Sequence, residues 1–300
     1  MSIFSKILNH NSFKDKPPVL MHIGAAGPNF EFWKAFSKFS TIISIDGVSK
    51  NNKKKNYKKD IKINNIISNK KQLTNFYITS DPHCSSLLLP KKDELKNWYF
   101  EHRFRVKKKL RVKTITINQL LKDLNIDYID WLVLDVQGMD LKILQSLDQK
   151  IKKKILFIDI EPGLRTFYNK EAKFHDVLKY MYNDFEIEDI IFGSNFKVSN
   201  KGMSKLDRGS LFLNEKKRKI YANITFLKKK IGNDIRSKLI NIMFLIAKNR
   251  IYEVNEINDL IKSKDEIFKK INKYLKIRLF IYKILYLLFL PLLIFKKFFR

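Results

Sequence analysis

The stretch WLVLDVQGMDLKIL, residues 131–144, decides the fold expected of this chain. Its first four residues are apolar and uncharged, which is typical of a buried strand. Asp135 follows where that strand should end, Gly138 interrupts the apolar pattern, and Leu141 and Leu144 resume it at helical spacing. Because ligands of open α/β sheets bind outside the carboxyl ends of the strands, Asp135 is a candidate functional residue. The alternative is a structural Asp that caps the following helix.

Apolar runs alternate with helical patterns on both sides of this stretch. Further strands are predicted at residues 19–24, 41–46, 61–68, 75–79, 155–160, 185–191 and 209–214, and helices at 30–39, 116–124 and 173–182. The segments 61–68 and 75–79 are expected to pair as a hairpin through residues 69–72. Such alternation predicts a mostly parallel sheet covered on both faces, within a domain at residues 18–215 that follows an extension at 1–17.

The composition changes after about residue 215, and a basic tail is predicted over 216–300. Helical patterns cover residues 220–230, 235–248 and 254–276. Residues 284–295 carry no charge and have basic residues on both sides, but a span needs roughly 20 apolar residues. We therefore expect this end to dock on an anionic membrane face without crossing it. A helix packed on the domain or on a partner, and a true span, are the alternatives.

Charge and cysteine content bear on partners and compartment. The chain has 300 residues and a net charge of +30, from 60 Lys and Arg against 30 Asp and Glu. That excess indicates an anionic partner, either nucleic acid or a membrane surface, although richness in Lys, Asn and Ile together explains part of it. A single cysteine, Cys84, excludes an intramolecular disulfide and fits a reducing cytosol. The expected location is cytoplasmic, with peripheral attachment to the inner face of the membrane.

Two further motifs are expected at the same sheet edge as Asp135. Small residues in MHIGAAGP, residues 21–28, would let the backbone approach a ligand after the first strand. Asp46 ends the second strand, where an acid accepts hydrogen bonds from ribose hydroxyls in nucleoside-binding α/β domains. A plain tight turn and a surface Asp are the respective alternatives. Their conjunction with Asp135 is more informative than any one of them.

These positions carry a family resemblance. The block LDVQGMD, residues 134–140, is similar to the Asp-x-(Glu/Gln)-Gly-x-Glu block of the FkbM family of S-adenosylmethionine-dependent methyltransferases. Residues 114–121 resemble that family's lead-in helix, 23–27 its first glycine motif, 80–87 its Ser-Ser-Leu segment, and 209–212 its closing strand. The chain differs at His22, at Asp46-Gly47 and at Ser68-Asn69, where the family usually has acidic residues or Glu-Pro.

The resemblance implies a Rossmann-like, seven-stranded sheet that binds S-adenosyl-L-methionine. No metal ligand is assigned to this site, and the sequence does not decide whether the reaction depends on a metal. The resemblance also implies O-methylation of a hydroxyl on a small-molecule acceptor, such as a sugar, a glycan or another secondary metabolite. The implied cofactor contacts are Gly24, Ala25, Gly27, Asp46, Ser68 and Asp135. Asp135 is the first candidate catalytic residue, because it could orient the cofactor or the acceptor. His83 is the second, as a base or a substrate contact, because it lies between the predicted hairpin and the helix at 116–124, where substrate could enter. A loop residue without a chemical role is the alternative for His83.

Other classes of protein remain open at this stage. Asp159 and Glu161, separated by one residue at a strand end, could form the metal pair of a membrane-associated glycosyltransferase or a sugar-nucleotide-binding protein. The net charge allows an RNA methyltransferase, but the Asn/Asp-Pro-Pro-Tyr motif of base amine methylation is absent, so nucleic acid is not favoured as a partner. A catalytically inactive scaffold is the last alternative.

Overall fold

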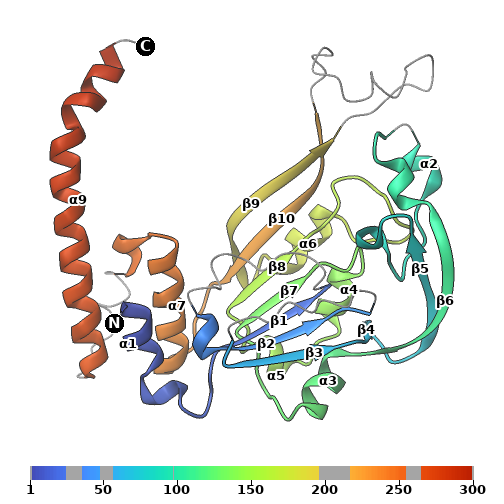
Figure 1. Cartoon of the computed structure of the whole chain (residues 1–300), viewed down its shortest axis with the longest axis horizontal. Helices are drawn as coiled ribbons and strands as arrows, with labels where there is room; N and C mark the ends of the chain where they lie inside the picture. The colour runs from blue at the N-terminus through green and yellow to red at the C-terminus, as the bar shows by residue number, and fades with distance from the viewer. Residues whose placement is uncertain are drawn as a thin grey trace. The chain divides into compact units, whose positions relative to one another are not determined.

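The computed structural model describes residues 2–24, 36–47, 57–96, 98–195, 217–254 and 265–298. The chain divides into two compact units (Figure 1). An α/β unit comprises Val19–Pro28 and Ser40–Ile231, and a helical unit comprises Met1–Pro18, Asn29–Phe39 and Gly232–Arg300. The expected α/β fold with a helical C-terminal part is therefore confirmed.

A seven-stranded sheet in the order β3-β2-β1-β7-β8-β10-β9 forms the centre of the α/β unit. Its strands are β1 (Val19–Ile23), β2 (Thr41–Ile45), β3 (Lys59–Ile63), β7 (Trp131–Leu134), β8 (Phe157–Ile160), β9 (Phe185–Asn195) and β10 (Arg218–Lys228). The first five strands of that order are parallel, and β10 is antiparallel to both of its neighbours. After β1 the chain adds β2 and β3 on one side of β1, and it later adds β7 on the opposite side of β1. The carboxyl ends of β1 and β7 therefore meet at a topological switch point, where such sheets bind ligands.

The central strands form because their side chains are apolar on both faces. Every residue of β1, β7 and β8 is buried. Core side chains of these strands pack with helices α3 (Ile117–Asp123), α4 (Asp140–Gln145) and α6 (Phe174–Met181), while α5 (Gln149–Lys152) precedes β8. Helices α3 and α6 confirm the predictions at residues 116–124 and 173–182.

A second, three-stranded sheet in the order β4-β6-β5 corrects the predicted hairpin. Strand β6 (Val106–Ile115) lies between β4 (Ile66–Ile67) and β5 (Leu73–Thr79), so the segments on either side of residues 69–72 do not pair with each other. The sequence interpretation missed β6 because most of its side chains are exposed and many are lysines. A strand with little burial on either face lacks the apolar pattern by which strands are recognised.

Strand β10 corrects a second prediction, the helix at residues 220–230. Its buried positions include Ile220, Ala222, Ile224 and Phe226, which alternate as a strand with one covered face requires. The strand belongs to the central sheet, so the α/β unit continues beyond the expected boundary at residue 215. The expected strand at 209–214 lies outside the described residues. Of the helix expected at 30–39, the structure describes only the end, where Ser37–Phe39 forms a short 3-10 helix.

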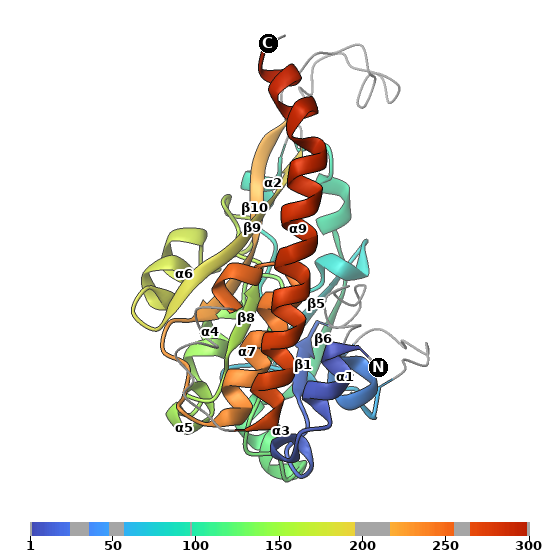
Figure 2. The same ribbon diagram turned by 90° about the vertical axis from the view of Figure 1, so that its left-hand side faces the viewer.

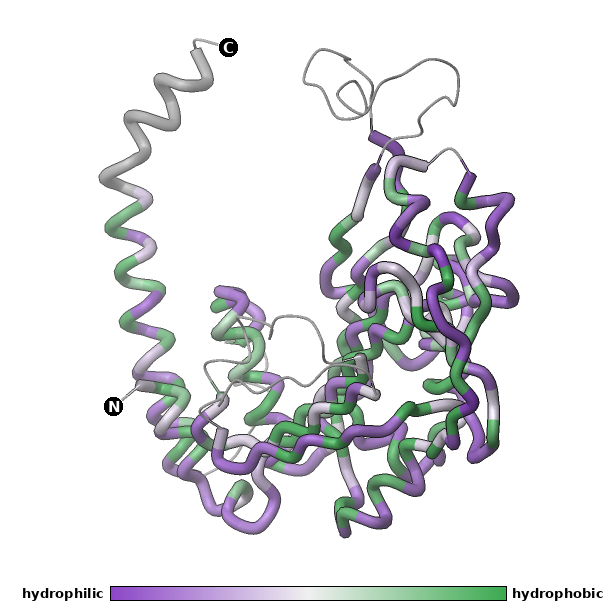
Figure 3. The backbone as a smooth tube through the Cα atoms, turned by 45° about the vertical axis from the view of Figure 1, so that its right-hand side comes forward, coloured by the Kyte–Doolittle hydropathy of each residue, from purple (hydrophilic) through white to green (hydrophobic). Residues whose placement is uncertain are grey.

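The helical unit contains α1 (Ile3–Leu8), α7 (Ile235–Ala247) and α9 (Glu266–Phe298), and α1 contacts each of the other two (Figure 2). Helix α7 confirms the prediction at 235–248. Buried side chains of α1 and α7, and Ile267, Ile271 and Leu275 of α9, form its core. Along the described part of α9, hydrophobic residues are interspersed with hydrophilic ones (Figure 3). Within the described residues, no helix combines the length and the apolar character that crossing a membrane requires.

Candidate active site

A cavity lies at the switch point, next to the carboxyl ends of β1, β2 and β7. Gly24, Asp46 and Asp135, which directly follow these three strands, all line it. The structure therefore brings together the three features that the sequence placed at one edge. His83 lines the same cavity from the short 3-10 helix η4 (Pro82–Cys84).

Only glycine fits at position 24, because the backbone of Asp135 lies too close for a side chain. Its φ is +82°, and a Cβ built on it would come within 1.8 Å of the carbonyl oxygen of Asp135. The amide of Gly24 also donates to the carbonyl of Ile45, at 3.0 Å. Glycine at this position therefore lets the ends of β1 and β7 approach each other. Ala25 and Gly27 lie outside the described residues.

Asp46 contributes a carboxylate to a cavity whose other walls are largely apolar. The backbone amide of Asp46 donates to Ile63 O at 3.1 Å, which holds the residue at the end of β2. Ile66, Phe76 and Met139 line the same cavity. A carboxylate beside apolar walls fits a nucleoside, which presents ribose hydroxyls next to a flat base.

Ser68 does not line this cavity. It is fully buried, its amide donates to Ile115 O at 2.9 Å, and its hydroxyl donates to Asn69 Oδ1 at 3.2 Å. The wall is formed instead by residues 65–67. The expected position was displaced because β3 ends at Ile63, earlier than the strand predicted to residue 68.

Asp135 does not cap the following helix. The N-cap position of α4 is Met139, and the carboxylate of Asp135 instead accepts a hydrogen bond from Gln137 Nε2 at 3.0 Å. Removal from water raises the pKa of Asp135, and the nearby charge of Asp46 adds to the rise, whereas the Gln137 hydrogen bond and His83 oppose it. A carboxylate held this way at a cavity wall is available to a ligand.

Asp140, the first residue of α4, has a structural role in the turn that precedes the helix. Its buried carboxylate accepts hydrogen bonds from the amides of Val136 and Gly138, both at 3.0 Å. These contacts hold the turn between β7 and α4, in which Gln137 and Gly138 have positive φ values of 53° and 93°. Burial and the charge of Asp135 raise the pKa of Asp140 to about 6.

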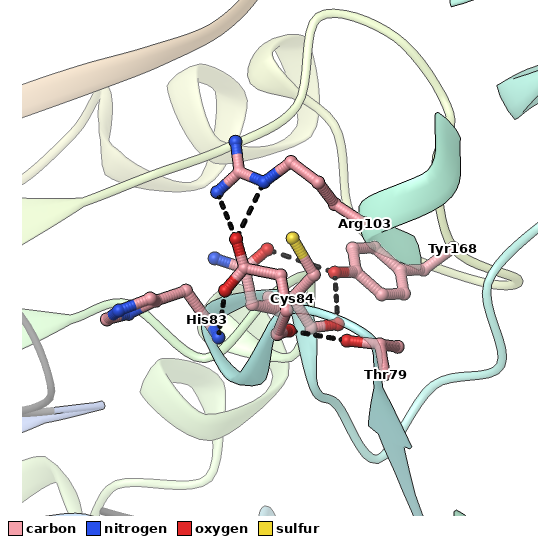
Figure 4. A network of polar contacts seen from close by, with 7 residues as sticks. Thr79, His83, Cys84, Arg103 and Tyr168 are labelled. Carbon is pink, nitrogen blue, oxygen red and sulfur yellow. Dashed lines mark hydrogen bonds and ion pairs between the residues drawn. The ribbon is translucent and has the colours of Figure 1, made fainter. Parts of the chain in front are cut away.

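A polar network fixes the segment that carries His83 (Figure 4). Asp81 accepts hydrogen bonds from the amide of His83 at 3.0 Å and from Arg103 Nε at 2.7 Å. The hydroxyl of Tyr168 lies 2.8 Å from Cys84 O and 3.0 Å from Gln137 Oε1, and both of these atoms are acceptors. Because Gln137 in turn holds Asp135, the network connects the His83 segment to the carboxylate at the end of β7.

A second cavity adjoins the first. Both are lined by His83, Asp135 and Gln137, which form their common boundary. The second cavity is also lined by Cys84, Phe100, Arg103, Phe104, Gly138, Glu161, Gly163, Phe167, Tyr168, Glu171, Ser194, Asn195, Ile220 and Tyr221. Two cavities that share a carboxylate, an imidazole and an amide at their boundary could hold two ligands next to each other.

The second cavity contains carboxylates with high proton affinity. Burial raises the pKa of Glu161 to about 8, with added contributions from the charges of Asp135 and Asp140. Burial also raises the pKa of Glu171 to about 7, although Phe167 and Tyr168 amides donate to its carboxylate. Sequence reasoning noticed Glu161 only as part of a metal pair and missed Glu171.

Asp159 and Glu161 do not form the metal pair considered from the sequence. Asp159 is buried and accepts hydrogen bonds from Trp131 Nε1 and Thr225 Oγ1, and it lines neither of the two cavities. Of these two acids, only Glu161 lines the second cavity. Among the residues that the structure describes, no group of three His, Cys, Asp or Glu side chains is arranged to hold a metal ion.

The fold and the site define a Rossmann-like α/β protein with a ligand site at the switch point of its sheet. The sequence model of the Methyltransferase FkbM domain matches residues 21–187, more than half of the chain. The chain therefore belongs to the FkbM methyltransferase family, as its resemblance indicated. Comparisons with curated proteins and with solved structures give no match.

Proposed function

We propose that this methyltransferase uses S-adenosyl-L-methionine to methylate a hydroxyl of a sugar, a glycan or another secondary metabolite. The observation that carries the proposal is the convergence of Gly24, Asp46 and Asp135 on one cavity at the switch point. Membership of the family supports methyl transfer, and the chemistry of the cavity supports this cofactor.

The residues of the first cavity suit the cofactor. Asp46 would accept hydrogen bonds from ribose hydroxyls, and Ile66, Phe76 and Met139 would surround the adenine. When bound, S-adenosyl-L-methionine supplies a methyl group on a positively charged sulfur, activated for displacement. The negative charge of Asp135, which lines both cavities, would favour that cation near their boundary.

The remaining tasks belong to the chain. An in-line displacement requires that the acceptor oxygen be held in one orientation, and the network through Gln137 and Tyr168 fixes the wall that would do so. His83, at the boundary of the two cavities, would contact the acceptor or help to remove its proton.

Ligand-dependent thermal stability tests the proposal without knowledge of the acceptor. A ligand present at 100 times its Kd stabilises a protein by about 2.7 kcal/mol, which raises the melting temperature measurably. We expect S-adenosylhomocysteine to stabilise the chain, and UDP-sugars and NAD to leave it unchanged. Stabilisation by a UDP-sugar alone would favour the glycosyltransferase alternative.

We further propose that α9 attaches the enzyme peripherally to the inner, anionic face of the membrane. Ile277, Phe280, Ile281, Ile284 and Leu285 follow the spacing of one helix face, and each is 41–64% exposed. Lys276 and Lys283 lie next to this apolar stripe, where they can reach lipid phosphates while the stripe enters the interface. Each basic residue near an anionic leaflet contributes about 1 kcal/mol.

A further inference from the structure

We propose that the second cavity binds a neutral, hydroxyl-rich acceptor and that the carboxylate of Glu161 takes the proton of the hydroxyl that is methylated. This inference rests on the methyltransferase function proposed above. It assigns a role to a residue outside the matched Asp135 block and narrows the class of acceptor.

The sheet register places Glu161 beside Asp135. Strands β7 and β8 are parallel neighbours, with Leu134 opposite Ile160. Asp135 and Glu161 are the next residues on the two strands, so they leave the sheet at the same level, where strands are ~4.8 Å apart. Both side chains line the second cavity. Glu161 therefore lies one strand away from the boundary at which cofactor and acceptor would meet.

The surroundings of Glu161 favour a proton acceptor. Asn223 on β10 hydrogen-bonds its carboxylate, which fixes its orientation. The other ionisable groups in its field are Asp135 from the end of β7, Asp140 from α4, and Tyr168, Tyr221 and Cys84 from the cavity wall. Burial, followed by the two Asp charges, raises the pKa of Glu161 to about 8. A carboxylate with that proton affinity is a better base than an ordinary glutamate, provided it is ionised when the acceptor binds.

The charge and shape of the second cavity select the acceptor. Asp135, Glu161 and Glu171 present carboxyl oxygens to hydroxyl donors, and the ionised Glu161 that takes the proton would repel an anionic ligand. The Arg103 guanidinium, which also lines the cavity, is already bonded to Asp81. Phe100, Phe104 and Phe167 add aromatic surface, against which the CH faces of a sugar ring can pack. A neutral ligand that carries several hydroxyl donors complements this lining.

The chemical step is balanced with these groups. The acceptor oxygen forms a bond to the methyl carbon as the carbon–sulfur bond breaks, and the electron pair of that bond stays on sulfur. The O–H bonding pair stays on oxygen while the proton moves to the Glu161 carboxylate. The products are a methyl ether, a neutral thioether and a protonated Glu161.

The experiment uses the full chain and measures transfer of a radiolabelled methyl group to sugar probes. The neutral probes are the methyl glycosides of glucose, galactose, mannose and rhamnose, and the anionic probes are the corresponding glucuronide and galacturonide. The variants are Glu161→Gln, Glu161→Asp and the surface control Glu186→Gln, whose side chain is exposed on β9. Isothermal titration of S-adenosylhomocysteine shows whether each variant still binds the cofactor product.

We expect transfer to at least one neutral glycoside and none to the uronides. Glu161→Gln should lower kcat at least ~100-fold, the lower end of what a general base contributes. In the wild type the rate should rise with pH as Glu161 ionises, and Glu161→Gln should remove this rise. The affinity of Glu161→Gln for S-adenosylhomocysteine should stay within about twofold of the wild type. Glu161→Asp, which keeps a carboxylate, should retain part of the activity. Glu186→Gln should match the wild type.

Provided that the wild type binds S-adenosylhomocysteine, any one of three results would overturn the inference. They are preferential methylation of a uronide, no methylation of any neutral glycoside, or an unchanged rate and pH profile in Glu161→Gln. Failure of the wild type to bind S-adenosylhomocysteine would instead remove the proposed function on which the inference rests.

Discussion

Removal of the Asp140 carboxylate should destabilise the α/β unit. Asp140 itself lines neither cavity, so the substitution changes no cavity-lining residue. Asp140→Ala leaves the amides of Val136 and Gly138 without their acceptor. A buried amide left unpaired costs about 1–3 kcal/mol, so the two together cost about 2–6 kcal/mol. Relief of a buried charge offsets part of this, because Asp140, with a pKa of about 6, is held ionised at neutral pH against its surroundings. We expect a net loss of about 2–3 kcal/mol.

Urea denaturation monitored by tryptophan fluorescence measures this loss. Asp140→Asn keeps one acceptor oxygen and should lose less, about 1 kcal/mol. Asp123→Ala is the control, because Asp123 is exposed on α3 and accepts only a surface hydrogen bond from Gln119. The control should stay within about 0.5 kcal/mol of the wild type. Equal stability of Asp140→Ala and Asp123→Ala would refute the assigned role of Asp140.

Four further outcomes are expected. Gly24→Val should lower the melting temperature, because its side chain meets the Asp135 carbonyl; an unchanged melting temperature would contradict this. Asp135→Asn should abolish most methyl transfer with little change in melting temperature, and the reverse pattern would make Asp135 structural. The folded-state pKa of Glu161 is raised from 4.5 to about 8, so wild-type stability should fall as pH rises through this range, and Glu161→Gln should show a smaller fall in urea titrations. Co-sedimentation with anionic vesicles should weaken with salt and in a Lys276→Glu, Lys283→Glu variant, whereas indifference to anionic lipid would argue against docking through α9.

The central strands could be predicted because burial on both faces leaves an unambiguous apolar run. Strands β1, β7 and β8 have no exposed residue, and their sequence positions were recognised. Strand β10 was misread as helix, since lysines flank it and only Ile220, Ala222, Ile224 and Phe226 show its alternation. Strand β6 has too little burial to leave a pattern, and its pairing with β4 and β5 depends on segments distant in sequence.

For the candidate site too, features set by the order of the strands could be predicted, and contacts between distant segments could not. Acids at strand ends could be located, because parallel strands bring their carboxyl ends to one edge, and Gly24, Asp46 and Asp135 do line one cavity. Contacts between distant segments could not be located. Tyr168 reaches Gln137 and Cys84 across the fold, and no local pattern announces such a contact.

Roles within the Asp135 block also required the structure. Sequence spacing offered Asp135 as either a functional carboxylate or a helix cap. The structure shows that Asp135 lies on the cavity wall and does not cap α4, whereas Asp140 accepts hydrogen bonds from the turn amides of Val136 and Gly138. Gln137 and Gly138 lie in this turn with positive φ values, a backbone conformation that the spacing of the acids does not reveal.

Isothermal titration of S-adenosylhomocysteine into the wild type and into Asp46→Ala tests the central claim most directly. Charge-assisted hydrogen bonds from ribose hydroxyls to Asp46 contribute on the order of 1.5–3 kcal/mol. We therefore predict one binding site in the wild type and an affinity roughly tenfold or more weaker in Asp46→Ala. Absence of binding to the wild type, or a loss below about twofold in Asp46→Ala, would contradict a cofactor site at the switch point of this sheet.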